Sequence, residues 1–173
     1  TNNKPQTTNC PVRYICQNYF MQTILILHNL VRWVILLFGV WTLLSGLAGL
    51  FGKKIYGAGD SKANFLFMLS CDIQLLLGLA LFIINQWYMR FKVMAETMKD
   101  TNSRFFTVEH TIMMIAAIVL VHLGRVSVKK AFTSHAKYKR TVIYFVLAIL
   151  LIIAAIPWPF REELARTLYR WFS

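Results

Sequence analysis

Long apolar segments alternate with short polar ones along most of this chain. Within each segment the apolar residues are continuous and do not alternate every second position, which indicates helices rather than the strands of a barrel. Each segment is long enough to cross a bilayer, which takes roughly 20 residues at about 1.5 Å of rise per residue. The predicted spans are about 23–51, 64–87, 105–123 and 141–158. The pattern predicts an all-α integral membrane protein, folded as a four-helix up-down transmembrane bundle with short amphipathic surface helices.

The same pattern divides the chain into three regions. Residues 1–20 form a polar N-terminal tail, residues 21–159 the four-helix transmembrane domain, and residues 160–173 an amphipathic C-terminal segment. The last segment has apolar side chains at helical spacing with charges on its other faces, which is typical of a helix lying on a membrane surface. A similar amphipathic stretch, 87–106, links the second and third spans.

Composition and charge agree with a membrane protein. The chain of 173 residues is 57% hydrophobic and has a net charge of +12. The basic residues fall almost entirely between the apolar segments, where they set orientation and attract anionic lipid, so we expect the lipid bilayer and not nucleic acid as the partner. The loops that follow the first and third spans are densely basic, and the same number of Lys and Arg residues is spread over longer segments on the other side. We therefore predict that these two loops are cytoplasmic and that both termini lie outside.

Five ionisable side chains interrupt the apolar segments or lie just inside their ends: His28, Arg32, Asp72, Glu109 and His110. An ionisable group near the centre of a bilayer costs at least about 2.5 kcal/mol, so such groups usually face the bundle interior or water. All five are therefore candidates for function.

The two histidines lie about five residues inside the first and third spans, which run in the same direction. Both should lie roughly 7–8 Å below the same surface, on helices that are diagonal partners in a four-helix bundle. We predict that His28 and His110 ligate the iron of one haem b. Arg32, one turn from His28, would neutralise a propionate or pair with an acid. Glu109 would accept a hydrogen bond from a quinol or orient a ligating imidazole. The alternatives are ordinary interhelical hydrogen bonds for the histidines and a favourable helix-dipole position for Glu109.

Asp72 lies near mid-membrane in the second span. Two hypotheses compete: a buried ion pair with Arg32, or a protonated carboxyl group that passes protons. Gln74 lies about 200° around the helix from Asp72, so the two cannot point at one spot. His122 is rotated about 120° from His110 and lies near a helix end, and we interpret it as interfacial.

Four short motifs, LHNLVRW, IQLLLG, RFFTVEH and IPWP, make the region from about Met21 to Pro159 similar to a family of small bacterial four-span membrane proteins labelled cytochrome b-like. The resemblance implies a location in the bacterial inner membrane with periplasmic termini. The residues that match the family's polar positions are His28, Arg32, Glu109 and His110. A histidine expected near Asp72 is not present in this chain, which argues against a ligand from the second helix.

The leading hypothesis is a cytochrome b-like subunit that binds one haem b between its first and third spans and moves electrons, with quinone as a candidate redox partner. The chain has no recognisable catalytic motif, so it would be at most the electron-transfer subunit of an oxidoreductase that contains other membrane subunits. One alternative is a haem-free accessory subunit, whose polar groups hold a larger membrane complex together. A proton pathway through Asp72 is the third hypothesis.

Overall fold

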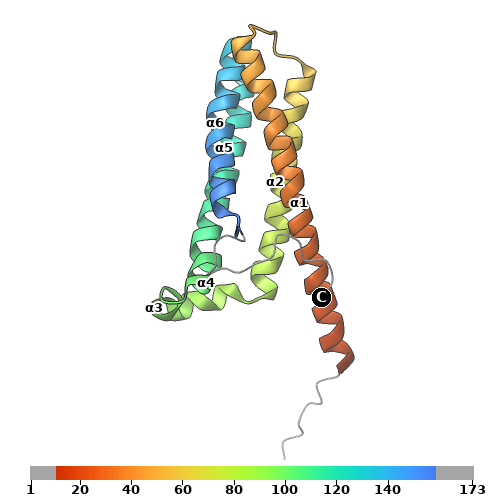
Figure 1. Cartoon of the computed structure of the whole chain (residues 1–173), viewed down its shortest axis with the longest axis vertical. Helices are drawn as coiled ribbons and strands as arrows, with labels where there is room; N and C mark the ends of the chain where they lie inside the picture. The colour runs from red at the N-terminus through yellow and green to blue at the C-terminus, as the bar shows by residue number, and fades with distance from the viewer. Residues whose placement is uncertain (1–10, 159–173) are drawn as a thin grey trace, which may run out of the picture.

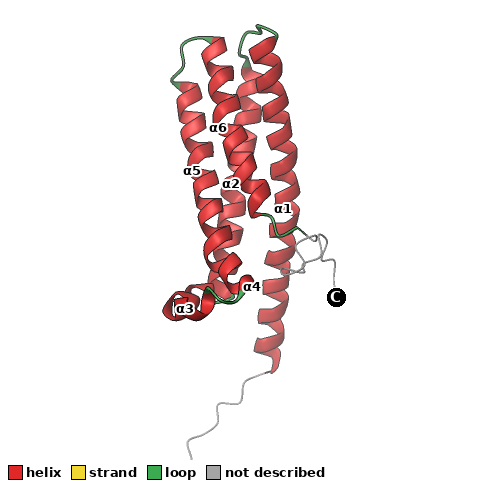
Figure 2. Cartoon of the chain, turned by 60° about the vertical axis from the view of Figure 1, so that its left-hand side comes forward, coloured by secondary structure: helices red, strands yellow, loops and turns green. Residues whose placement is uncertain are grey.

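The structure, a computed structural model, describes residues 11–158, with side chains described from residue 18 onward. Throughout this part of the chain the regular structure is helical (Figure 2). Four helices are long and apolar enough to span a membrane. They belong to α1 (Pro11–Phe51), α2 (Ala58–Ile84), α5 (His110–Lys129) and α6 (Ser134–Ala155). The predicted C-terminal segment 160–173 and the first ten residues of the predicted tail lie outside the described residues.

The helices are longer than the apolar segments that predict them. Helix α1 is described from Pro11 onward, so residues 11–20 of the predicted tail are helical. Helix α6 begins at Ser134 rather than near 141, where the Thr133 side chain accepts a hydrogen bond from the Ala136 N–H at 3.2 Å. Apolar content thus marks only the part of each helix suited to lipid and misses the polar first turns.

The four long helices form a ring in which each packs against two neighbours. The neighbouring pairs are α1–α2, α2–α5, α5–α6 and α6–α1, so α1 and α5 are diagonal partners, as are α2 and α6. Figure 1 shows the α1–α2 and α5–α6 loops at the same end of the bundle. The predicted up-down bundle, with its two basic loops on one side, is confirmed.

The connection between α2 and α5 folds into short helices across the other end of the bundle (Figure 1). It contains the 3₁₀ helix η1 (Trp87–Val93), α3 (Met94–Thr97) and α4 (Thr101–Arg104). A five-residue π-helix, η2 (Phe105–Glu109), then leads without a break into α5. The predicted surface helices are therefore present here, and the π-helix places the first residues of α5.

Small residues allow α1 and α6 to approach closely. A Cβ atom on Gly46 would lie 3.1 Å from Val142, and one on Gly49 would overlap the Tyr138 ring. Close approach through small residues is how membrane helices gain packing energy without a hydrophobic driving force between them. At the centre of the bundle, Phe67 of α2 meets Phe145 of α6 edge to face, with ring centroids 5.5 Å apart.

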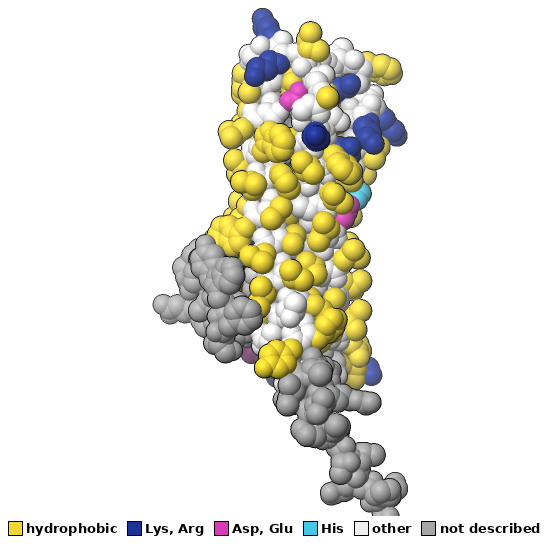
Figure 3. Space-filling view, turned by 90° about the vertical axis from the view of Figure 1, so that its right-hand side faces the viewer, with side chains coloured by type: hydrophobic (Ala, Val, Ile, Leu, Met, Phe, Trp, Pro, Cys, Tyr) yellow, Lys and Arg dark blue, Asp and Glu magenta, His cyan; other side chains and the backbone are white. Residues whose placement is uncertain are grey.

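The outer surface of the bundle is apolar along most of its length. Figure 3 shows hydrophobic side chains covering the middle of the bundle and Lys and Arg side chains gathered at one end. Leu37 and Leu76, for example, are each 67% exposed. Such a surface is unfavourable in water and suited to lipid, so the chain is a multi-pass membrane protein.

Candidate functional site

The imidazole rings of His28 and His110 meet inside the bundle. Their centroids are 6.5 Å apart and their planes are inclined by 59°. His28 belongs to α1 and His110 to α5, the diagonal partners, so the rings approach across the core at one level, as the sequence predicts.

The hydrogen bond that His110 makes determines which of its nitrogens is free. Its Nδ1 lies 2.9 Å from the backbone carbonyl oxygen of Ala155, the last residue of α6. A carbonyl oxygen only accepts hydrogen bonds, so Nδ1 must be the protonated nitrogen and donate to it. The Nε2 atom therefore keeps its lone pair, in the arrangement found for histidines that ligate metals. The rings of Phe105 and Phe106 flank this imidazole at centroid distances of 5.9 and 6.1 Å.

The Ala155 carbonyl is available because of the prolines that follow α6. In a continuing helix it would accept from the N–H four residues later, but that residue is Pro159, which has none. Pro157 likewise has no N–H for the carbonyl of Ile153, which accepts instead from the Ile156 N–H at 3.3 Å and from the Trp158 indole N–H at 2.9 Å. The IPWP motif thus leaves the Ala155 carbonyl to a side-chain donor, and His110 is that donor.

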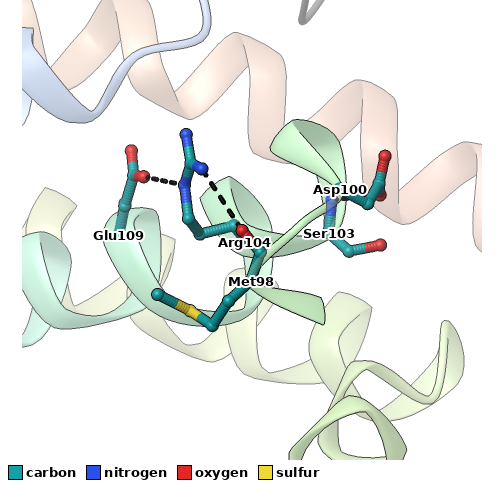
Figure 4. Close-up of polar contacts among 5 residues, drawn as sticks. All are labelled: Met98, Asp100, Ser103, Arg104 and Glu109. Carbon is teal, nitrogen blue, oxygen red and sulfur yellow. Dashed lines mark hydrogen bonds and ion pairs between the residues drawn. The ribbon is translucent and has the colours of Figure 1, made fainter. Parts of the chain in front are cut away.

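The π-helix η2 sets the direction in which His110 points. The His110 N–H bonds to the carbonyl of Phe105, five residues earlier. A π turn holds one residue more than an α turn, so the side chains that follow are rotated by roughly 100° compared with an unbroken α-helix. The ion pair between Arg104 Nε and Glu109 Oε1, 2.8 Å long, joins residues with the same five-residue spacing (Figure 4). The wide turn thus directs His110 inward and is held on its outer side by this pair.

One role that the sequence suggested for Glu109 was to orient a ligating imidazole. In the structure the Glu109 carboxylate is directed at a different partner. This carboxylate pairs with Arg104, which also donates to the Met98 carbonyl at 3.3 Å (Figure 4). The two side chains are 41% and 36% exposed, so the pair lies at the bundle end. The group that orients His110 is instead the Ala155 carbonyl, which sequence reasoning missed although Pro159 indicates it.

Replacing Glu109 by glutamine should therefore have a small effect. An exposed ion pair contributes about 0–1 kcal/mol, and the imidazole loses no hydrogen bond in this variant. We expect the thermal unfolding midpoint in detergent to stay close to that of the unmodified protein. A large drop of the midpoint in Glu109→Gln would show that the pair holds the π turn more strongly than an exposed ion pair should.

His28 is held between α2 and His110. A Cβ atom on Gly78 would lie 3.3 Å from its Cε1 atom, so the glycine leaves just enough space for the ring. Gln74 donates from Nε2 to the His28 backbone carbonyl at 2.9 Å, which fixes this part of α1 against α2. The Nδ1 atom of His28 and the Oε1 atom of Gln74 are buried and accept or donate no hydrogen bond within the described part of the chain. Neither Gln74 nor Gly78 was predicted as part of the site.

Arg32 lies one turn from His28 on α1 and is buried. Its guanidinium carbon lies 5.3 Å from the centroid of the Trp33 ring, in a cation–π contact. A buried guanidinium cation one turn from the paired imidazoles adds positive charge to this end of the core.

The carboxylate of Asp72 contacts His122 and does not pair with Arg32. Asp72 Oδ1 lies 3.3 Å from His122 Nε2, whereas His122 Nδ1 lies 3.0 Å from the carbonyl oxygen of Ile118. Helices α2 and α5 are neighbours here, and depth estimates from the sequence are too coarse to distinguish the partners. Gln74, in contrast, bonds to α1, so the prediction that it and Asp72 face different ways is confirmed. His122, interpreted as interfacial, is the side chain that Asp72 contacts.

The paired histidines are not part of a larger group of metal-binding side chains in the described part of the chain. Among residues 18–158, whose side chains are described, no group of three His, Cys, Asp or Glu side chains is close enough to hold a metal ion. A bare metal ion in a protein usually needs three or four protein ligands, whereas haem iron takes only axial ones. Two opposed imidazoles are thus a donor set suited to haem.

The chain matches no protein-family model, no curated protein and no solved structure with which it was compared.

Proposed function

We propose that this protein is a cytochrome b-like membrane subunit that holds one haem b between α1 and α5 and transfers electrons. The observation that supports this most strongly is the 6.5 Å separation of the His28 and His110 rings. Metal–nitrogen bonds to imidazole are about 2.0–2.1 Å long, so two rings on opposite sides of one metal ion have centroids about 6–6.5 Å apart. The observed separation of the rings is therefore the separation expected of two imidazoles that share one iron atom.

Three contacts around the two rings also support the proposal. His110 has its Nδ1 proton fixed by the Ala155 carbonyl, so its Nε2 lone pair is ready to bind. His28 has a buried nitrogen with no hydrogen-bond partner among the described residues, and such an atom is costly unless it gains one or the ring binds a ligand. Gly78 leaves the edge of the His28 ring clear of a side chain, and two phenylalanine rings border His110.

Each residue of the site would have a distinct role. His28 and His110 would bind the iron, and Arg32 would compensate the negative charge of a propionate. When bound, the haem supplies a one-electron redox centre. The Ala155 carbonyl would hold the His110 ring in the binding orientation. A membrane-soluble quinol is a suitable electron donor, because it would reach the protein through the lipid.

Reduction of the haem by quinol would test this function. Purified protein is mixed anaerobically with a short-chain ubiquinol or menaquinol, and the reduced α-band is followed by absorption. We expect the band to appear with quinol and to be abolished by His110→Ala. A haem that dithionite reduces but neither quinol does would exclude quinol as the donor while leaving haem binding intact.

One observation favours the alternative, a haem-free accessory subunit of a larger membrane complex. The Asp72 and His122 side chains are 34% and 46% exposed, in spans where polar groups are costly on a lipid-facing surface. A neighbouring subunit could cover this pair. A colourless protein that co-purifies with other membrane subunits, and loses them in Asp72→Ala, would support this alternative.

Proton transfer through Asp72 would require His122 as its first partner, and unchanged proton flux in vesicles containing Asp72→Asn would rule it out.

A further inference from the structure

A small polar cavity lies among the helix ends beside the two basic loops. Its volume is about 170 Å³. This is smaller than the roughly 300–1,000 Å³ of sites for whole drug-sized molecules, so the cavity suits a compact group. The residues that line it come from the α1–α2 loop, the start of α2, the end of α5 and the start of α6: Tyr56, Ser61, Asn64, Arg125, Val128, Lys129 and Lys137.

The side chains that line this cavity carry positive charge and no negative charge. The lining includes Arg125, Lys129 and Lys137 but no acidic residue. The ion pair between Arg104 and Glu109 and the contact between Asp72 and His122 lie elsewhere. Three cations around one small cavity repel each other, and an anion placed between them would relieve that repulsion.

The nearest acidic residue, Asp60, is committed to other partners. Its carboxylate accepts hydrogen bonds from the Ser45 hydroxyl, from the Tyr138 hydroxyl at 2.9 Å and from the Gly57 N–H at 2.9 Å. These contacts fasten the start of α2 to α1 and α6. Asp60 is therefore a structural residue and is not part of the cavity lining.

Further contacts hold the basic side chains and the uncharged polar side chains of the cavity lining in place. Arg125 donates from one guanidinium nitrogen to the Ser61 carbonyl at 3.2 Å, and it has further N–H groups to offer. The Lys137 ammonium lies 5.3 Å from the centroid of the Tyr56 ring. Asn64, itself buried, donates to the Tyr56 hydroxyl oxygen at 3.0 Å, and this hydroxyl carries one proton of its own. Burial and the Asp60 carboxylate raise the pKa of Tyr56 to about 12, so this proton is retained at neutral pH.

The position of the cavity also favours an anion from the membrane. The cavity lies at the ends of membrane-spanning helices, the level of lipid head groups, where basic pockets between helices bind anionic lipids.

We propose that this cavity binds the phosphate group of an anionic phospholipid through Arg125, Lys129 and Lys137, with Tyr56 as an additional hydrogen-bond donor. The site does not depend on whether haem is bound. Inorganic phosphate has the same recognition chemistry and is the other source that an experiment must distinguish.

Native mass spectrometry of the purified full-length chain, released from a neutral detergent, tests the site. The probes are phosphatidylglycerol, the neutral-headed phosphatidylcholine, and inorganic phosphate as competitor. The site variant is Lys129→Gln/Lys137→Gln. The matched control is Lys130→Gln/Lys139→Gln, which removes the same charge from the adjacent positions, outside the cavity lining.

We expect the unmodified protein to retain phosphatidylglycerol in preference to phosphatidylcholine, and the site variant to bind phosphatidylglycerol at least about tenfold more weakly than the control variant. If millimolar phosphate displaces phosphatidylglycerol, the cavity is an anion site that takes free phosphate as its ligand. If phosphate does not displace the lipid, the ligand of the cavity is the phospholipid. Equal binding of the two lipids by the unmodified protein, or equal weakening in both variants, would overturn the proposal. The lipid comparison needs no variant, so it stands even if the site variant folds poorly.

Discussion

Alanine at either His28 or His110 is expected to remove most of the proposed haem from the purified protein. The centroids of the two rings are 6.5 Å apart, so each variant deletes one of the two proposed ligands. Loss of a residue that merely supports a metal ligand already costs about 10–100-fold in metal affinity, so loss of a ligand should lower haem content at least about tenfold. Any haem that remains should have the spectrum of a five-coordinate, high-spin iron. Haem content per chain and the absorption spectrum measure both effects.

The other two histidines provide matched controls. His122 pairs with Asp72 near the other end of α5, and His135 is exposed in the first turn of α6. Alanine at either position should leave haem content and spectrum unchanged. All four variants should elute from size exclusion like the unmodified protein, which separates ligand loss from misfolding. Equal haem loss in His135→Ala would contradict ligation by the pair in the core.

Gly49→Ala is expected to destabilise the bundle more than other single-methyl additions. The new Cβ atom would overlap the Tyr138 ring, which is buried and cannot move freely. The Tyr138 hydroxyl donates to Asp60 at 2.9 Å and lies 3.3 Å from the Ile55 carbonyl, so a shift of the ring would also disturb the α1–α2 loop. Overpacking of this kind typically costs about 1–3 kcal/mol. The measurement is the thermal unfolding midpoint in detergent.

Gly59→Ala is the control for that experiment. A Cβ atom on Gly59 would meet no other atom within 4 Å, so the added methyl group enters open space in the first turn of α2. This variant should be neutral or slightly more stable than the unmodified protein, because alanine has less conformational freedom to lose on folding. Equal unfolding midpoints for Gly49→Ala and Gly59→Ala would show that α1 and α6 do not pack as closely as the structure indicates.

The bundle and the level of the two histidines could be predicted from the sequence because both depend on length and order alone. Four apolar segments imply four antiparallel spans, and equal distances of His28 and His110 from the starts of two parallel helices imply equal depth. The Ala155 carbonyl could also have been predicted, since Pro159 cannot donate to it.

The side-chain partners of the acidic residues could not be predicted in the same way. Glu109 reaches Arg104 because a π turn separates them, and a π turn leaves no recognisable pattern in the residues Phe105–Glu109. Asp72 meets His122 because α2 and α5 are neighbours at that depth. An error of one residue in a helix start rotates every later side chain by 100°, which is enough to exchange one partner for another.

The visible absorption spectrum of the unmodified protein, purified in mild detergent from cells supplied with a haem precursor, tests the central claim most directly. Opposed imidazoles on α1 and α5 predict one haem per chain, with the sharp reduced α-band of a six-coordinate, low-spin iron. A well-folded protein that is colourless under these conditions, and that stays colourless when titrated with haemin, would contradict haem ligation by His28 and His110.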